Sequence, residues 1–356
     1  MDPMMLAIEL NLVGKLIYNS LYSWVKTWSG SSELIGTFAI TVIIFTLFLK
    51  VATLPLDFWQ KQLGRKNARK MEMMKPELDK INKQCGDNKE LLMQKQRAVH
   101  RQFKYNAFGA CLPTIFNLII FGVVLSGFNV SVRYHNYNMF ELLSQEYSST
   151  YQATTATLYE DGDLSAEDVE TATRSAEEAV LALYEPEKFL LTTNVFMADT
   201  WKHPIPTIKE FAGRGMGDLN IPGIDTSEYQ KVMKPIIEAY NFNSDGKATW
   251  NGYLILPILS FVLSLLSAKL FKPPEQPVPL GQTEEQAQRT KSQAKMMQYL
   301  MPIMMGIFPL FYSTAFAIYM VVSNMFTTIL NIIYNFFSKR ADAKYKDMIM
   351  STTIKS

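Results

Sequence analysis

Long runs of apolar residues alternate with heavily charged segments along the 356-residue chain. The first apolar run, residues 34–56, carries a single charge, that of Lys50. At about 1.5 Å per residue, a helix of this length spans about 34 Å, which is enough to cross the hydrocarbon core of a bilayer. The pattern therefore predicts a membrane protein in which soluble segments connect membrane-spanning helices.

Four further spans follow from the same criterion. Residues 296–338 contain no charged side chain and are too long for one crossing but just long enough for two, so we expect a break near Tyr312-Ser313-Thr314. The expected fold class is an all-α membrane protein with five transmembrane helices. The predicted spans are residues 34–56, 108–128, 253–271, 296–313 and 315–338.

The segments between the spans differ in charge. Residues 57–105 contain 13 Lys and Arg against 6 Asp and Glu, and the short loop 272–295 opens with Lys-Pro-Pro and ends in basic residues. The positive-inside rule places both loops in the cytoplasm, as it does the C-terminal tail, residues 339–356. Because the chain changes side at each span, the N-terminus and residues 129–250 are then expected outside. We therefore expect a multi-pass protein of the cell (plasma) membrane with a cytoplasmic C-terminus.

Residues 57–105 are expected to form a basic, antiparallel helical hairpin. Pro76 disfavours helix at Lys75 and suits the first turn of a new helix, and a second helix is expected from Lys89 to about Tyr105. Such a hairpin can bind lipid head groups or ribosomal RNA through charge alone. A merely solvated pair of helices is the alternative interpretation.

Residues 129–250 are acidic, with 9 Lys and Arg against 19 Asp and Glu. Helical patterns occur at residues 165–183 and 226–240, and little sustained strand alternation is present. We therefore expect a mainly helical extracytoplasmic insertion between the second and third spans.

Residues 1–33 are predicted to form an amphipathic helix on the membrane surface. Apolar residues recur there at spacings of three and four, with polar residues on the opposite side. An additional span is the alternative, but polar residues inside the segment oppose it. The apolar positions are Leu6, Leu10, Val13, Ile17, Leu21 and Trp24, and the opposing polar residues are Glu9, Asn11, Lys15 and Asn19.

Polar side chains are sparse in the spans but fall into stripes. Thr46, Lys50 and Thr53 share one face of the first span, where the lysine either faces a wet stripe or snorkels to the nearby interface. The second span holds one amide, and hydroxyl groups line single faces of the third and fifth spans. These residues are Asn117, Ser260, Ser264, Ser267, Ser323 and Thr327.

The composition argues against several kinds of chemistry. Only two cysteines occur, Cys85 and Cys111, and neither lies in the predicted outer insertion, so no disulfide framework is expected. The three histidines stand apart without metal-ligand spacing, and the spans hold no His, Asp or Glu that could act as an acid, a base or a ligand. We therefore expect neither an enzyme nor a bound metal or other cofactor.

Several motifs follow one another in the order of the predicted spans. They are Lys50 four residues before Leu54-Pro55-Leu56, the hairpin sequence Lys75-Pro76-Glu77, residues 106–113 (NAFGACLP) at the start of the second span, and the last two spans, MMQYLMPIMMGIFPLFYSTAFAIYMVVSNMFTTI, with Tyr319 and Asn324. Together they resemble the YidC/Oxa/Alb family of membrane-protein insertases, and residues 189–201 resemble the short outer loop of its Gram-positive members. The chain departs from the family in having Lys50 where Arg is usual, Asn117 and Ile119 where Gln and Pro are usual, and a much longer outer loop.

The resemblance implies an insertase, whose spans surround a hydrophilic groove that is open to the cytoplasm and to lipid. It also implies nascent membrane-protein clients, the Sec translocon, the ribosome and membrane lipids as partners, and no DNA. The alternative function is a small ion channel or transporter with Lys50 as an anion site, although no inverted repeat supports it. The candidate groove residues are Lys50, Thr46, Thr53, Asn117, Ser260, Ser264, Ser267, Tyr319, Ser323 and Thr327.

Overall fold

The computed structural model describes residues 8–29, 34–85, 88–105, 107–158, 164–270, 289, 292–293, 296, 300, 303–304 and 306–353, and of residues 107–114 and 338–353 only the backbone. Every regular element in these ranges is a helix, and the β pairing among them consists of isolated bridges. The expected all-α class is therefore confirmed for the described part of the chain. Nearly all of the predicted loop 272–295 and parts of the predicted span 296–313 lie outside the described residues.

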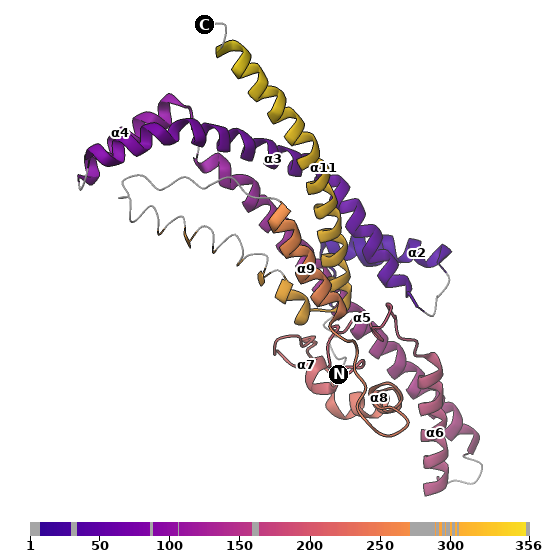
Figure 1. Ribbon diagram of the computed structural model, residues 1–356. Helices are drawn as coiled ribbons and strands as arrows, with labels where there is room; N and C mark the ends of the chain where they lie inside the picture. The colour runs from indigo at the N-terminus through magenta and orange to yellow at the C-terminus, as the bar shows by residue number, and fades with distance from the viewer. Residues whose placement is uncertain are drawn as a thin grey trace. The chain divides into compact units, whose positions relative to one another are not determined.

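Three of the described helices are long and apolar enough to cross a membrane (Figure 1). They are α3 (Thr37–Cys85), the part Ile115–Leu158 of α5 (Ala107–Leu158) and the part Thr314–Phe337 of α11 (Thr314–Thr353). A further apolar helix, α9 (Ile255–Leu270), is shorter. Helix α11 begins at Thr314, shortly after the 3-10 helix η2 (Phe308–Leu310), where the sequence analysis expects a break.

Two compact units make up the chain. Unit 1 comprises Met1–Thr46, Gly122–Ser260 and Ile307–Val321, and unit 2 comprises Leu47–Phe121, Phe261–Gly306 and Val322–Ser356. Helices α3, α5, α9 and α11 each contribute residues to both units. The division of the chain therefore falls inside helices and not in linkers.

The helical hairpin differs from the prediction at Pro76. Helix α3 runs without a break through Pro76 to Cys85, so no new helix begins there. A proline inside a helix leaves the carbonyl four residues earlier, here that of Glu72, without its usual donor. Both Glu72 and Pro76 are exposed, so water can serve this carbonyl and the helix continues. Helix α4 (Lys89–Gln102) begins where predicted, with the Asn88 side chain as its N-cap.

In unit 2, α4 lies antiparallel beside the end of α3 (Figure 1). Nζ of Lys70 donates to the carbonyl of Lys104 (2.6 Å), and Nε2 of Gln96 donates to Oδ1 of Asn82 (2.9 Å). The buried apolar seam of the pair is thin, so polar contacts and the chain connection carry much of its geometry. The seam consists of Met74, Cys85, Leu92 and Val99.

The second predicted span is the beginning of a much longer helix. Helix α5 is continuous over 52 residues, whereas the span was expected to end at residue 128. Hydropathy falls after that point, but buried residues continue at helical spacing and keep the segment helical. These residues are Val132, Phe140, Leu143 and Tyr147. The segment 129–250, which is predicted to be an insertion, therefore begins inside a helix.

Residues 12–28 of unit 1 form one helical stretch, made of α1 (Leu12–Gly14), the π-helix η1 (Lys15–Tyr22) and α2 (Ser23–Trp28). Ile17 is buried as the apolar pattern indicates. At the far end the prediction is off by one residue, because Val25 is buried and Trp24 is 55% exposed. The i→i+5 hydrogen bonds of η1 widen its turns, which moves the buried position along the helix.

The helices within residues 164–250 agree closely with the sequence pattern. Helix α6 (Ala166–Leu183) and helix α8 (Thr226–Asn241) match the predicted ranges to within one residue at each end, and α7 (Ile208–Ala212) is a short additional helix. Ser165 and Asp168 form a capping box at the start of α6, and Asp225 caps α8. An ion pair between Lys234 and Glu177 (3.2 Å) connects α8 with α6.

Residues 187–202, which we call the capping loop, accept hydrogen bonds from the N-termini of three helices. The acceptors are the carboxylates of Glu187 and Asp199 and the carbonyls of Val195 and Met197. The donors, at 2.7–3.1 Å, are the backbone N–H groups of Phe38 in α3, Leu254 and Leu256 at the start of α9, and Thr314 and Ala315 in α11. The first N–H groups of a helix lack an acceptor within that helix, and this one loop supplies acceptors to three apolar helices.

Asn251, which is fully buried, holds the capping loop in place. Its Oδ1 accepts from the N–H of Asn194 (2.8 Å), and its Nδ2 donates to the carbonyls of Asn194 (3.0 Å) and Ala198 (2.8 Å). Its backbone N–H donates to the carbonyl of Lys202 (2.7 Å), and its carbonyl accepts from the N–H of Thr193 (2.9 Å). One asparagine therefore satisfies the polar groups of a loop that lies largely inside the protein.

Glu187 joins the capping loop to two other parts of unit 1. Its Oε1 accepts from the hydroxyl of Tyr22 (3.0 Å), and its Oε2 accepts from the N–H of Phe38 (3.1 Å). A side chain at Gly36 would collide with Oε2, so the absence of a Cβ at that position permits the approach. Burial raises the pKa of Glu187 above its ordinary value.

This raised pKa predicts a pH-dependent stability. Just above the ordinary glutamate pKa of about 4.3, folded protein keeps a proton on Glu187 that the unfolded chain has released. The free energy of unfolding should therefore fall as the pH rises through this window. Melting of the protein in nanodiscs from about pH 4 to about pH 7 should show this slope, and Glu187→Gln should reduce it. Exposed Glu185 provides the control, and an equal loss of slope in Glu185→Gln would contradict the assignment.

Candidate functional site

Lys50 is the only charged residue in the first 20 residues of α3, Thr37 to Leu56. Its Nζ donates a hydrogen bond to Oγ1 of Thr327 on α11 (3.2 Å). Oγ1 of Thr327 donates in turn to the carbonyl of Ser323 (2.9 Å), and Oγ1 of Thr53 donates to the carbonyl of Lys50 (3.2 Å). All four residues belong to unit 2. Hydrogen bonds thus connect four of the predicted site residues, of which Thr327 contacts the ammonium group.

A carboxylate that the sequence analysis missed lies beside this cluster. Asp57 follows Lys50 by seven residues, which is about two turns along the same face of α3, and its charge acts on both Lys50 and Lys61. The predicted span ends at residue 56, which assigns Asp57 to the loop. Because α3 continues as a helix, the spacing of seven residues is the signal that would have identified Asp57.

The predicted serine stripe of α9 faces asparagines of α11. Nδ2 of Asn324 donates to Oγ of Ser264 (2.7 Å), and Nδ2 of Asn331 donates to Oγ of Ser267 (3.0 Å). Farther along, Nδ2 of Asn335 donates to the carbonyl of Leu270 (2.8 Å). Hydrogen bonds between membrane helices average about 0.6 kcal/mol each, so these three position the two helices more than they stabilise them. Asn335 was missed, although its spacing of four from Asn331 places the two on one face.

The other predicted residues lie elsewhere. In unit 2, Nδ2 of Asn117 donates to Oε1 of Gln60 (2.8 Å), which connects α5 with α3. Thr46, Ser260 and Tyr319 belong to unit 1, where all three are buried. Oγ1 of Thr46 donates to the carbonyl of Val42 within its own helix (2.6 Å).

Two polar atoms of α11 have no hydrogen-bond partner among the described residues. They are Oγ1 of Thr328 and Oδ1 of Asn331, and both are buried. A buried polar atom without a partner costs about 1–3 kcal/mol, and water or a polar ligand at this face of α11 would recover that cost.

The chemistry that this arrangement offers is charge and hydrogen bonding. Within the described ranges, no three His, Cys, Asp or Glu side chains are placed to hold a metal ion. The ammonium group of Lys50 offers a positive charge, and its neighbour Thr327 offers a hydroxyl. Neither group implies a covalent step.

The long apolar helices and their polar cluster define this chain as an all-helical membrane protein. The family model described as 60Kd inner membrane protein matches residues 30–341, which is most of the chain. The chain therefore belongs to this family, the YidC/Oxa/Alb family, and the sequence-based resemblance is confirmed.

Several curated relatives are named membrane protein insertase YidC. The protein of Fusobacterium nucleatum is 34% identical over 116 residues, which is 31% of this chain and 55% of that relative. The protein of Chloroherpeton thalassium is 28% identical over 99 residues (28% of this chain, 16% of the relative), and that of Caldanaerobacter subterraneus is 29% identical over 86 residues (24% and 40%). The matched regions thus cover from about a sixth to about half of these relatives. No solved structure matches the chain.

Proposed function

We propose that this protein is a membrane-protein insertase, which helps nascent membrane proteins to enter the lipid bilayer. The observation that carries the proposal is the placement of Lys50 in the apolar part of α3, with the hydroxyl of Thr327 as its partner, in a member of this family. A cation inside a span costs about 2.5–3.5 kcal/mol on insertion scales, so a retained lysine favours a functional role.

In the proposed mechanism, Lys50 and the polar groups around it line a hydrophilic groove. A polar segment of the client enters the groove part-way, which shortens the apolar barrier that this segment must cross. The apolar segment of the client then moves into lipid. Burial of its apolar surface and attraction between Lys50 and acidic residues of the client drive the process, and no nucleotide is needed.

The proposal includes a topology and a set of partners. Five spans, an outside N-terminus and a cytoplasmic C-terminus in the plasma membrane agree with the basic inner loops. The clients are nascent membrane proteins, and the basic α3–α4 hairpin is suited to contact the ribosome or lipid head groups. Cooperation with the Sec translocon also belongs to the proposal. The outer insertion, residues 129–250, would act as a scaffold or bind partners.

Reconstitution tests this function against the channel alternative. Proteoliposomes containing the purified protein should insert a single-span client, measured by protease protection, without added nucleotide. Empty liposomes provide the baseline, and anion flux is measured in parallel without client. Anion flux together with baseline insertion would reject the insertase and favour a channel with Lys50 as its anion site.

A further inference from the structure

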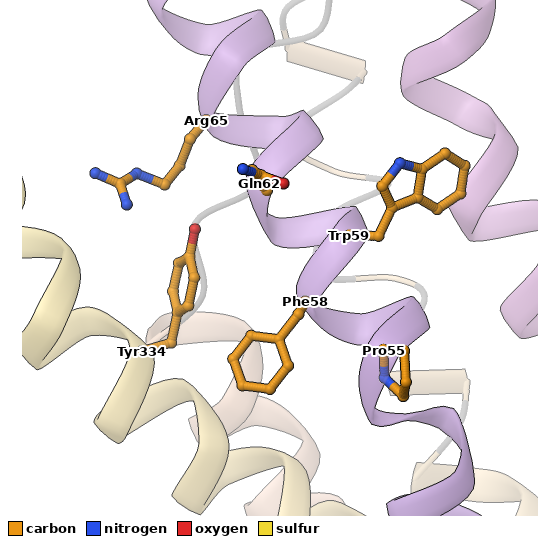
Figure 2. A pocket seen from close by; sticks show the side chains of 6 residues that line it. All are labelled: Pro55, Phe58, Trp59, Gln62, Arg65 and Tyr334. Atoms are coloured by element: carbon orange, nitrogen blue, oxygen red, sulfur yellow. The ribbon is translucent and has the colours of Figure 1, made fainter.

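Unit 2 contains an open cavity of about 450 Å³ beside the start of the basic hairpin. Five of its six lining residues come from α3 and one comes from α11 (Figure 2). The ring of Tyr334 stands between Phe58 and Arg65 in this view. The lining residues are Pro55, Phe58, Trp59, Gln62, Arg65 and Tyr334. Apolar, amide and cationic groups therefore share one concave surface.

The polarity of this surface changes along α3. Pro55 and Phe58 lie at the apolar end, Gln62 follows one turn later, and Arg65 and Arg69 continue the same helical face. Because α3 is continuous here, the change from apolar to cationic occurs along a single rigid helix. A ligand that follows this face would meet aromatic rings first and guanidinium groups last.

The α11 side of the cavity reinforces this order. Nζ of Lys61 lies 5.2 Å from the centre of the Tyr334 ring, and Cζ of Arg65 lies 5.8 Å from it, so the ring holds two cations near the rim. Apolar side chains next to Tyr334 on α11 are exposed, Phe336 by 54% and Phe337 by 63%. Exposed aromatic rings beside clustered cations are typical of a helix at a bilayer interface.

From this geometry we propose that the cavity binds the head group of an anionic phospholipid. The phosphate would lie near Arg65, and the glycerol and upper acyl chains would lie against Phe58, Trp59 and Pro55. The phospholipid and the wall of the cavity are both amphiphilic, and in each of them charged groups are followed by apolar surface. The predicted span ends at residue 56, which places the cavity at the depth of lipid head groups. The proposal does not depend on insertase activity.

Trp59 provides a probe inside the cavity. The other tryptophans, Trp24, Trp28, Trp201 and Trp250, are replaced by Phe, and the full-length protein is placed in vesicles of phosphatidylcholine and phosphatidylglycerol. Either lipid carries brominated acyl chains in separate samples of equal composition. Brominated phosphatidylglycerol should quench Trp59 more strongly than its share of the lipid predicts. Arg65→Gln should lower this enrichment about fivefold, while Arg97→Gln, at an exposed cation of α4, should leave it unchanged.

A second variant and two competitors distinguish the possible outcomes. Tyr334→Leu should also reduce the enrichment, which keeps the test valid if Arg65→Gln does not fold. Soluble glycerol phosphate should not displace the lipid, and displacement at low concentration would show recognition of free phosphate instead. Equal quenching by the two brominated lipids would overturn the proposal. Enrichment of phosphatidylglycerol that persists in both variants would also overturn it. Displacement of the lipid by an apolar client peptide alone would show that the cavity is a client site instead.

Discussion

Replacement of Lys50 by alanine should lower insertion of a client with an acidic translocated segment by about tenfold and change insertion of a neutral client by less than about twofold. The cause is the loss of one charge pair. Two unit charges about 4 Å apart attract by about 1 kcal/mol in water and about 4 kcal/mol near a protein surface, and 1.4 kcal/mol corresponds to a factor of ten. Lys50 is half-buried, so we expect its attraction for a client carboxylate to lie between these values.

Matched variants define the test of Lys50. Arginine should substitute well because it keeps the charge and is more weakly hydrated, and glutamate should be worse than alanine for the acidic client because it reverses the attraction. The control is Lys269→Ala, which removes an exposed cation from the end of α9. The measurement is the insertion rate of paired clients that differ only in the charge of the tail. Equal effects of Lys50→Ala on both clients would mean that the lysine acts by hydration or only snorkels.

The largest effect on stability is expected at Asn251. Asn251→Ala removes three side-chain hydrogen bonds, which leaves the buried N–H of Asn194 unpaired, while the carbonyls of Asn194 and Ala198 keep only the N–H groups of Met197 and Thr200. An unpaired buried group costs about 1–3 kcal/mol and each of the other two hydrogen bonds is worth about 0.5–1.5 kcal/mol, so the variant should lose at least about 2 kcal/mol of unfolding free energy. The capping loop should loosen as well, because its fixed shape depends on this side chain.

Hydrogen exchange and thermal melting of the protein in nanodiscs measure these two consequences for Asn251→Ala. The melting temperature should fall, and amides of residues 193–202 should exchange faster than in the unaltered protein. Gln230→Ala, which truncates an exposed amide on α8, serves as the control and should change neither. Unchanged exchange in the capping loop together with a normal melting temperature would show that other contacts fix the loop.

Local signals in the sequence were sufficient for much of the helical architecture. The helical patterns at residues 165–183 and 226–240 and the change of pattern near Thr314 each depend on residues close together in the chain, and the structure has helices there. Two local expectations were wrong for reasons that are also local. Pro76 stays within α3 because solvent reaches the carbonyl that it leaves unpaired. Helix α5 continues beyond its apolar segment because its buried face continues.

The pairing of distant residues could not be predicted from one sequence. The stripe on the first span indicates that Lys50 faces polar surroundings, but nothing in it selects Thr327, which is 277 residues away. The same holds for Glu187 with Phe38 and for Asn251 with Asn194, separated by 149 and 57 residues. These contacts depend on how the helices pack, and periodicity reports only which side of a helix is polar.

The unbroken course of α5 constrains how its length can change. Adding or deleting one residue in this helix turns everything beyond it by about 100° and moves it by about 1.5 Å along the axis. Such a change would withdraw Phe140 from the rings of Phe211 and Tyr229, which lie 5.9 Å and 5.2 Å from it. Seven residues nearly restore the angle but still move the segment by about 10 Å along the axis. Insertions and deletions within α5 should therefore be poorly tolerated, in evolution and in protein engineering, whatever their length.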